Sequence, residues 1–517
     1  MRTNAGRTKI VGLLLLTAIV IAPFVYLPIN PLRVFAAFPR FVRFMYSNFL
    51  PPNFDGITAH FPVILRTLLF AVVGTYISAF LAFFLALFIA RETCRFTAVR
   101  GVLRFIISFF RNVPLLVWGT VLVFIFGIGS LVGVVALVLA TLGFLARSYA
   151  DSIDEIGANK LEGLKSTGAG YWQILVHGLL PEFIPSWINW TLFAFEINIR
   201  ASAVLGMVGA GGLGLLIQVN LDFRSFRRAM ALVILLIGLV FAAEILTNLI
   251  RRVVALQQKT NIPPLLEKAM QFGTVAALVW LFLWSSRTLE LNFAVFATRF
   301  MANAQNVLPQ FIAFNPEIVG EVLYQLMISM LLGICGLVLG AVVSIVLSFL
   351  AASNTTPFAP LGYIIKGAVS VIRAVPSLVL ILMVVASLGF GHTTAVVGLM
   401  FSSLGYLTRA FIASIEEQDF GIIEAMRATG ATRLQIITHG LLPGLATSFI
   451  AWLAIRLESN IADSVSLGIV GAGGVGMLIA RFNRQLNMAN LATTIYVVFG
   501  VMVVLEVVSN WLRKSKT

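Results

Sequence analysis

The chain has 517 residues, of which 59% are hydrophobic and only 11% are charged. Soluble domains carry roughly 25% charged residues, because charged side chains cover the surface that faces water. With a mean hydropathy of +0.99, the composition excludes a water-soluble protein and indicates an integral membrane protein. Long continuous apolar runs favour spanning helices over a transmembrane barrel, which would show short alternating segments.

The formal net charge of +15 raises the question of nucleic-acid binding. In a membrane protein such an excess follows from the Lys and Arg bias of cytoplasmic loops. We therefore predict no nucleic-acid partner, although the surplus also suits membrane lipid or cargo of negative charge. The two cysteines, Cys94 and Cys335, are too few for a disulfide framework, so we predict two free thiols.

Apolar runs predict an all-α membrane fold with about twelve spanning helices, each needing about 20 residues. The first run follows Arg2, Arg7 and Lys9 and lacks a clear cleavage site, which favours an uncleaved first helix over a signal peptide. In chain order the predicted helices cover residues 10–28, 62–90, 100–126, 132–148, 183–205, 229–250, 269–288, 322–351, 361–387, 392–408, 445–467 and 492–511.

The sequence contains an internal repeat. Residues 162–181 return as residues 424–443, an offset of 262 (424 − 162), with 11 of 20 positions identical. Further motifs keep the same offset without a gap: 111–114 with 373–376, 127 with 389, 147 with 409, 196–199 with 458–461, and 209–214 with 471–476. A register held over so long a stretch indicates a duplication.

The duplication predicts a first repeat of about six helices over residues 1–255, a linker over 256–268 and a second repeat of about six helices over 269–517. Six predicted helices separate the two matching loops, so both loops face one side and the halves are parallel and pseudo-symmetric. Basic residues place both termini and the linker in the cytoplasm. Segments predicted to face outward also hold arginines, so either some loops are misplaced or the outer face is cationic. These arginines are Arg33, Arg40, Arg43, Arg224, Arg227, Arg228, Arg481 and Arg484.

The duplicated loop is the most informative motif. Each copy has an acidic residue, a glycine six positions later and a Leu-Pro pair at its end: Glu162, Gly168 and Pro181, then Glu424, Gly430 and Pro443. The glycine breaks a helical loop into two pieces, and the proline suits the first turn of the next span. Such an element fits a groove on a soluble partner, and the alternative is an amphipathic surface turn.

This pattern resembles the signature loop of permease subunits in binding-protein-dependent ABC importers. In that family the loop is the coupling helix that fits the nucleotide-binding subunit. The resemblance implies a type I ABC importer permease-like fold, ABC ATPase subunits, two copies of which hold ATP and Mg, and an extracytoplasmic substrate-binding protein. The first copy departs slightly, with Gly163 and Leu164 where small alanines are usual.

A narrower resemblance covers most of both halves from about residue 60 onward. The Arg-x-Val-Pro motif, the coupling loop and residues 195–214 resemble the permease of phosphonate importers (PhnE-like), two copies of which look fused here. The resemblance implies phosphonate or a related oxyanion, phosphate or phosphite, as cargo. The second copy has Ala462 where the first has Arg200. An ABC permease for methionine or another small zwitterion, and an ion-driven secondary transporter, stay open as alternatives.

Ionisable residues within spans are costly and usually face partners or water. Arg111 and Arg373 lie three residues before a proline in each half, where they could present paired guanidinium groups to a crossing anion or cap the carbonyls of a broken helix. Glu196 and Arg200 are spaced to pair with each other. The second candidate pathway cluster consists of Glu196, Asn198, Arg200, Glu458, Asn460 and Asp463.

Two glycine-rich segments formally satisfy the dinucleotide motif G-x-G-x-x-G. That motif requires a preceding strand, whereas these follow predicted membrane helices, so we interpret them as tight turns and candidate outer gates. Packing of small residues between helices is the alternative. The glycines are Gly209, Gly211 and Gly212, then Gly471, Gly473 and Gly474.

Enzymatic chemistry is not indicated. Lys165 lacks the preceding glycine pattern of a phosphate loop, so the chain has no recognisable ATPase site, and we predict a transport subunit that binds no cofactor itself. His177 and His439 recur at the end of the loop, where solvated histidines are expected. No cluster has metal-ligand spacing, and no nucleophile–base pair stands out.

Overall fold

The computed structural model describes residues 17, 20–27, 29–94, 96–166, 168–257, 279–291, 293–469, 471 and 473–514. In this part of the chain every regular element is a helix, which confirms the all-α prediction. Of the predicted linker 256–268, only residues 256 and 257 are described, and the rest lies outside the described residues. Cys94 and Cys335 are both buried free thiols, as predicted.

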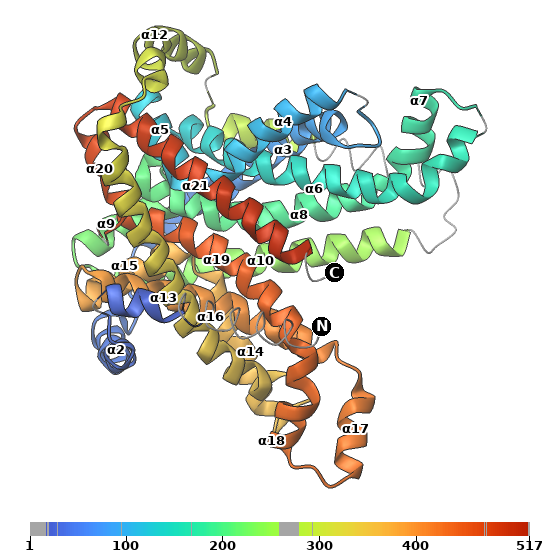
Figure 1. The fold of residues 1–517 in the computed structure, drawn as a ribbon. Helices are drawn as coiled ribbons and strands as arrows, with labels where there is room; N and C mark the ends of the chain where they lie inside the picture. The colour runs from blue at the N-terminus through green and yellow to red at the C-terminus, as the bar shows by residue number, and fades with distance from the viewer. Residues whose placement is uncertain are drawn as a thin grey trace. The chain divides into compact units, whose positions relative to one another are not determined.

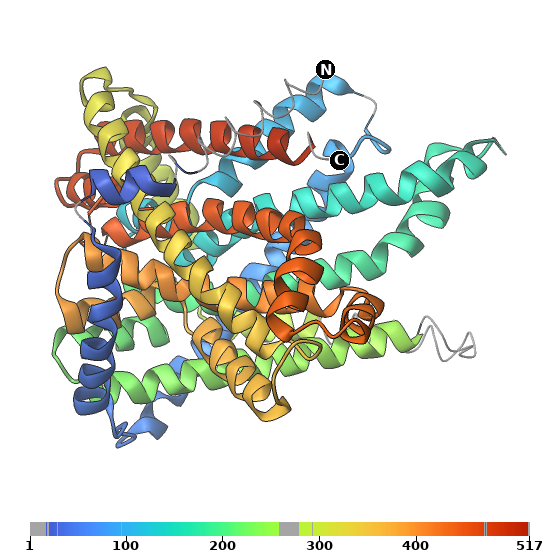
Figure 2. The same ribbon diagram turned by 60° about the horizontal axis from the view of Figure 1, so that its bottom comes forward.

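Residues Pro52–Ile312 form one compact unit, called here the central unit. Helix α3 packs on α6 and α8, and α4 and α5 pack on α6. Figure 2 shows α6 and α8, in teal and green, running side by side. Besides helical residues 279–288, its elements are η2 (Ile57–His60), α3 (Phe61–Ile89), α4 (Thr97–Asn112), α5 (Leu115–Phe126), α6 (Ser130–Ser166), α7 (Tyr171–Gln173), η3 (Ile174–Leu179), α8 (Leu180–Leu205), η4 (Gly206–Ala210), α9 (Leu213–Asp222), α10 (Phe226–Gln257) and α12 (Phe293–Ile312).

The second compact unit, called the terminal unit, combines Met1–Pro51 with Ala313–Thr517. Helix α13 packs on α16 and α19 in the same way as α3 packs on α6 and α8. Besides helical residues 20–26, its elements are α2 (Pro31–Phe44), η1 (Met45–Phe49), η5 (Pro316–Ile318), α13 (Val319–Ala351), α14 (Ala359–Ala374), α15 (Ser377–Leu388), α16 (His392–Glu416), α17 (Phe420–Ala428), α18 (Arg433–Gln435), η6 (Ile436–Leu441), α19 (Leu442–Ile469), α20 (Val475–Arg484) and α21 (Met488–Lys514).

The structure repeats at the offset found in the sequence. Helices α4, α5 and α9 have their counterparts in α14, α15 and α20, each with both ends displaced by 262 residues (for example 359 − 97). Side-chain contacts recur as well: the indole of Trp190 donates to Ser152 Oγ at 3.1 Å, and the indole of Trp452 donates to Ser414 Oγ at 3.1 Å. Equal spacing of elements and contacts confirms the duplication.

Two predicted helices are wrong in one respect, because each is two helices. Residues 100–126 divide into α4 and α5 with a bend of 87°, and residues 361–387 divide into α14 and α15 with a bend of 93°. Pro114 and Pro376 lack an N–H, and each proline disfavours helical backbone in the residue before it. Val113 accordingly has φ −82° and ψ 120°, and Val375 has φ −79° and ψ 125°.

Seven described helices are long and apolar enough to span a membrane, and ten spans result if each bent pair counts as one. The remaining two of the twelve predicted spans are 183–205 and 269–288. The first is helical within α8 but carries Glu196 and Arg200. The second is described only from residue 279 onward. The chain is therefore a multi-pass membrane protein.

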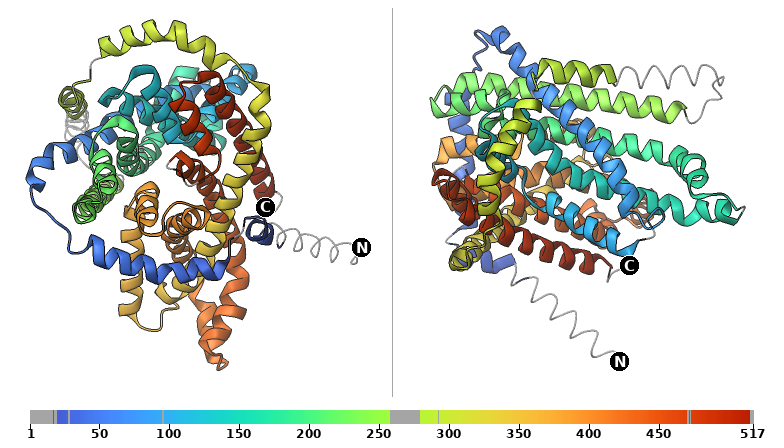
Figure 3. Two further views of the ribbon diagram at one scale, coloured as in Figure 1. Left: turned by 90° about the vertical axis from the view of Figure 1, so that its left-hand side faces the viewer. Right: turned by 90° about the horizontal axis from the view of Figure 1, so that it is seen from above.

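The sequence pattern missed α2, α12, α9 and α20. Helix α2 packs against α15 and α16 of the terminal unit, and Figure 3 shows it, in blue, beside these orange helices. Helix α12, its counterpart 262 residues later (293 − 31), packs against α5 of the central unit. Helix α2 of the first repeat thus belongs to the terminal unit, which the second repeat mainly forms. Helix α12 of the second repeat belongs to the central unit, which the first repeat mainly forms.

Each unit has an apolar core under its duplicated loop. In the central unit Tyr149 is fully buried and packs edge-on against Phe183, with ring centroids 5.7 Å apart. In the terminal unit Phe411 stacks on Phe449 at 4.1 Å. These clusters join the loop to the spanning helices, because leucines and isoleucines from η3 and η6 belong to them.

Small residues allow close helix crossings. A Cβ atom at Gly143 of α6 would lie 2.7 Å from the Arg111 amide nitrogen and 2.8 Å from the Ile107 carbonyl oxygen of α4. At the equivalent Gly405 of α16, the added Cβ would lie 3.2 Å from Ile372 Cγ2 and 3.3 Å from the Arg373 backbone nitrogen. Close approach of backbones through small residues is a usual way to pack membrane helices.

This difference predicts unequal costs for the same substitution. Gly143→Ala should lower the free energy of unfolding by about 1–3 kcal/mol, because backbone of α4 must shift to admit the methyl group. Gly405→Ala should cost clearly less, since its neighbours need to move by only a few tenths of an ångström. Thermal unfolding of the purified variants in one detergent measures both. Equal losses of stability would contradict the packing argument.

Candidate functional site

The duplicated loops, called here coupling segments (residues 162–181 and 424–443), lie at the ends of helical hairpins. Figure 1 shows α7 at the end of the α6–α8 hairpin, and α17 and α18 at the end of the α16–α19 hairpin. Pro181 and Pro443 are the second residues of α8 and α19, as the spacing predicted. Glu424 is exposed on α17, and Glu162 lies within α6.

The glycine of each coupling segment ends a helix, as predicted. Gly168 has φ +78° and Gly430 has φ +79°, in the left-handed region that favours glycine at a helix end. Open space surrounds both Cα atoms, so backbone conformation and not crowding requires glycine there. The reversal lets α7 and α18 fold back onto the hairpin core.

The two segments differ before the glycine. Helix α6 continues to Ser166 without interruption, whereas α16 ends at Glu416 and a separate α17 begins at Phe420. Asp419 creates this second start, because its carboxylate accepts the Gly421 N–H at 2.9 Å and caps α17. The position that corresponds to Asp419 in the first half is Gly157, which has no side chain to cap a helix.

Sequence reasoning missed an exposed apolar residue in each coupling segment. Trp172 of α7 is 72% exposed and Leu434 of α18 is 70% exposed, and the two positions are related by the repeat offset. Apolar side chains on their inner side, such as Leu175 and Ile436, are buried. Each segment therefore presents a largely exposed apolar side chain at the same position, as a protein-docking element would.

Arg111 and Arg373 are half-buried residues of the last turns of α4 and α14, directly before the bends. A cation at a helix C-terminus is favoured by the unpaired carbonyl groups there. Each arginine thus lies where a membrane helix is interrupted, and its role in presenting a cation to an anion or in capping the broken helix stays a prediction.

The predicted pathway asparagines lie between helices of one unit. Asn198 is 2% exposed; its amide donates to Thr75 Oγ1 at 2.9 Å and accepts from Thr141 Oγ1 at 2.8 Å. Asn460 is fully buried and donates to the Gly333 carbonyl at 3.2 Å and to Ser403 Oγ at 2.7 Å. These hydrogen bonds satisfy polar groups within helix packing.

Glu196 pairs with a helix distant in sequence. Its Oε1 accepts from Thr247 Oγ1 at 2.7 Å and from Arg251 Nη2 at 3.1 Å, both on α10. Arg251 and Glu196 thus form an ion pair between α10 and α8. Arg200 and Glu458 are half-buried on α8 and α19.

In the terminal unit, Asp463 of the predicted pathway cluster pairs with a buried arginine that sequence reasoning missed. Arg456 of α19 is 8% exposed; its Nη2 donates to Ser402 Oγ at 2.6 Å and to Asp463 Oδ2 at 3.1 Å. Its guanidinium also lies over the ring of Tyr406, 5.6 Å from the centroid. Ser377, the first residue of α15 after the bend, donates to Asp463 Oδ1 at 3.3 Å.

This cluster belongs to the second half alone. At the five equivalent positions the first half has apolar residues throughout: Ala194, Ala140, Ala201, Phe144 and Leu115. Within the described residues the Nε atom of Arg456 is buried without a hydrogen-bond partner. Comparing the halves position by position would have revealed the cluster, because five polar residues replace apolar ones at one offset.

The glycine-rich segments are tight turns, as interpreted. All six glycines have positive φ, from +77° at Gly474 to +107° at Gly209. After the turn in the central unit, the Leu213 N–H donates to Thr67 Oγ1 at 2.8 Å; in the terminal unit the Val475 N–H donates to Ser329 Oγ at 3.0 Å. Gly211, Gly212, Gly471 and Gly473 share this geometry. A gating role stays a prediction.

A family model described as "Binding-protein-dependent transport system inner membrane component" matches residues 82–256 and again residues 344–515. The chain belongs to this family. The two matches begin 262 residues apart (344 − 82), so the family unit is present twice in one polypeptide. The resemblance carried by the coupling segments is therefore confirmed, and the chain is a permease component of transport systems that depend on a binding protein.

This permease is also similar to several named permease proteins. It is 32% identical over 91% of its length to the phosphate-import permease protein PhnE of Mycolicibacterium smegmatis, 88% of which is covered. It is 30% identical over 39% of its length to the phosphite transport system permease protein PtxC of Stutzerimonas stutzeri, 74% of which is covered. The chain is also 25% identical, over 40% of its length, to the probable D-methionine transport system permease protein MetI of Vibrio cholerae. The match covers 96% of MetI.

The Arg456 cluster yields a stability prediction. Arg456→Ala should lower the free energy of unfolding by about 1–3 kcal/mol, because the largely buried carboxylate of Asp463 loses its cation. The double variant R456A/D463A carries the alanines that the first half has at these positions, so it should recover most of the loss. Thermal unfolding compares the two. A double variant no more stable than Arg456→Ala would contradict a paired role.

Proposed function

We propose that this chain is the transmembrane subunit of an ABC importer that carries phosphonate or a related oxyanion, phosphate or phosphite, across the cell membrane. The observation that carries the proposal is the 32% identity, over 91% of the chain, to a protein named as a phosphate-import permease. The similarity to PtxC, a protein named for phosphite transport, points in the same direction. Similarity to the methionine permease MetI is lower, so a zwitterionic cargo is the second candidate.

Two copies of an ABC ATPase would dock on the two coupling segments. Support comes from the position of these segments at the hairpin ends and from the outward Trp172 and Leu434. ATP and Mg belong to that ATPase in this proposal, and this chain contributes no nucleotide site. Closure of the ATPase pair would push the segments together and switch access to the path. An ion-driven transporter has no use for such paired elements.

On the opposite side an extracytoplasmic binding protein would deliver the cargo, with both termini of the chain in the cytoplasm. The glycine turns before α9 and α20 are our candidates for the outer gate. Arginines such as Arg228 and Arg481 would attract an anion to that face by long-range electrostatics. For the path itself we retain Arg111 and Arg373, because an arginine fork binds phosphoryl oxygens bidentately.

Uptake by the native host tests the cargo. Deleting the gene should reduce uptake of labelled methylphosphonate or phosphate to background, and the wild-type gene should restore it. Excess unlabelled phosphate separates the oxyanions, since a phosphate importer loses methylphosphonate uptake and a phosphonate-selective importer retains it. Loss of labelled methionine uptake instead, with oxyanion uptake intact, would overturn the oxyanion assignment and leave the permease assignment standing.

Charge reversal in the coupling segments tests the docking. The double variant E162R/E424R should weaken co-purification of the ATPase at least about tenfold, because truncated or reversed interface charges cost several kcal/mol. Glu424 is exposed, so its reversal leaves the fold intact. Glu317→Arg, which reverses an exposed acidic residue of η5 outside both coupling segments, is the control. Normal co-purification and uptake in the double variant would refute the assignment.

A further inference from the structure

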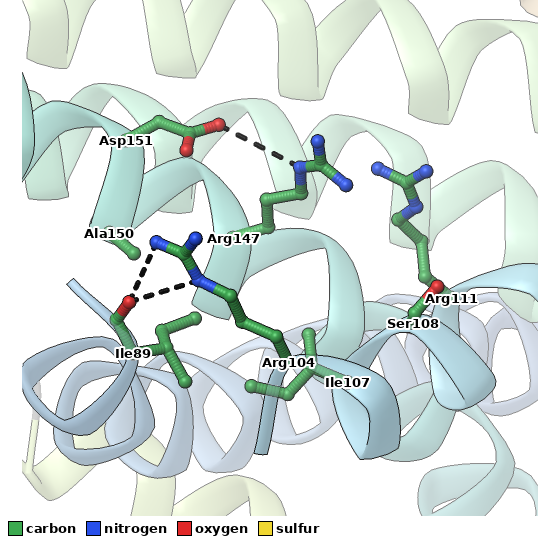
Figure 4. Close-up of a pocket in the computed structure, with 8 residues that line it drawn as sticks. All are labelled: Ile89, Arg104, Ile107, Ser108, Arg111, Arg147, Ala150 and Asp151. Carbon is green, nitrogen blue, oxygen red and sulfur yellow. Dashed lines mark hydrogen bonds and ion pairs between the residues drawn. The ribbon is translucent and has the colours of Figure 1, made fainter. Parts of the chain in front are cut away.

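A cavity of about 140 Å³ lies in the central unit where the end of α3 meets α4 and α6. Three arginines and a single acidic residue contribute to its wall: Arg104 and Arg111 from α4, and Arg147 and Asp151 from α6. Figure 4 shows the guanidinium groups of Arg111 and Arg147 pointing toward one another across the space. The formal charges of the lining side chains therefore leave an excess of two positive charges.

The arginines are held in place by specific contacts. Arg104 donates from Nε and Nη2 to the Ile89 carbonyl at 3.1 and 2.8 Å, which fixes its guanidinium at the C-terminal end of α3. Arg147 Nε lies 3.8 Å from Asp151 Oδ2, near the outer limit of an ion pair, and both side chains are partly exposed. Exposed ion pairs of this kind contribute little to stability, and Asp151, the acidic side chain of the wall, lies at the edge of its reach to Arg147.

The second half distributes these charges differently. Lys366 stands at the position of Arg104 and binds Glu416 closely, at 2.8 Å, whereas Arg104 lies 3.7 Å from its own acidic neighbour Asp154. Ala413 replaces Asp151. Loss of the Asp151 carboxylate would by itself favour an anion in the second half, whereas the close Lys366–Glu416 pair disfavours one. The candidate cavity is the one in the first half, which three arginines line.

The cavity lies beside the amphipathic helix α4. Helix α4 exposes large apolar side chains, Val102 at 61% and Phe105 at 62%, and Phe96 directly before it at 74%. The loop between α3 and α4 is basic, so the positive-inside rule places this end at the cytoplasmic surface. Basic pockets between spanning helices at that surface suit phospholipid headgroups.

We propose that this cavity binds a phosphoryl group at the cytoplasmic side of the first half. Arginine forks bind phosphoryl oxygens bidentately and with charge-assisted hydrogen bonds. The five heavy atoms of a phosphate need the space of two or three waters of about 30 Å³ each, which the cavity provides. The phosphoryl group belongs to an anionic phospholipid or to free phosphate, since both offer the same oxygens. Arg111 of this wall is also our candidate for the transport path, but the proposal of a bound phosphoryl group holds whichever cargo the importer carries.

Binding to the purified full chain in a neutral detergent tests the site. Dioleoylphosphatidylglycerol, dioleoylphosphatidylcholine and inorganic phosphate are titrated separately, with potassium chloride at matched ionic strength, and the rise in unfolding temperature and native mass spectra are recorded. Stabilisation by phosphatidylglycerol alone identifies a lipid site, and stabilisation by phosphate alone identifies a site for the free anion. Stabilisation by both identifies a site that accepts either.

Two variants change the affinity in opposite directions. Arg147→Gln removes a cation and should weaken binding about fivefold, as expected for one basic residue at a membrane surface. Asp151→Asn removes the carboxylate from the wall and should strengthen binding. Arg66→Gln, an exposed arginine near the N-terminal end of α3 and outside the cavity, makes the same charge change and should leave affinity unaltered.

Absence of binding by both probes, or equal affinity in Arg147→Gln and the wild type, would overturn the proposal. Should Arg147→Gln fail to fold, the sign of the Asp151→Asn effect decides, since an anion site must gain from losing a carboxylate. The readout is binding and not uptake, so failure here leaves the proposed importer function untouched, and failure of the uptake experiment leaves this site untouched.

Discussion

Inside a bilayer no water is available to the peptide groups, so a spanning chain must satisfy its own backbone hydrogen bonds. Continuous helices do so automatically, and every interruption needs another partner. The glycine turns show how this protein supplies one: after each turn a side-chain oxygen, Thr67 Oγ1 or Ser329 Oγ, accepts the first free N–H of the next helix. The same solution in both halves indicates that this requirement shaped the whole fold.

Each unit combines a repeated frame with charges that are not repeated. Helix crossings, the core beneath the coupling segments and the Asn198 and Asn460 contacts recur at one offset. The Arg456–Asp463 pair occurs only in the second half, and the carboxylate of Asp151 only in the first. In a symmetric dimer every substitution occurs twice; in a fused chain it occurs once. Fusion therefore lets buried charges, which are costly in membranes, be placed in one half alone.

The coupling segments likewise combine features that the two halves share with features that only one half has. Their glycines adopt one backbone conformation, and their outward apolar residues occupy one position. The capping carboxylate of Asp419 nevertheless divides the second segment into separate helices, while α6 continues unbroken. The surfaces offered to the proposed ATPase subunits would thus share a contact point and differ in the helix that leads to it.

The sequence by itself determined the membrane class, the repeat, most spanning segments and the glycine turns, because apolar length and backbone conformation are local properties. The sequence even marked the position of each bend through Pro114 and Pro376, although a single continuous helix was predicted across each of them. Only the tertiary structure decided the angle of the bends, the placement of α2 and α12, and the pairing of Glu196 with Arg251 on α10. Those features depend on contacts between residues far apart in the chain, and no local pattern specifies which distant helix supplies the partner.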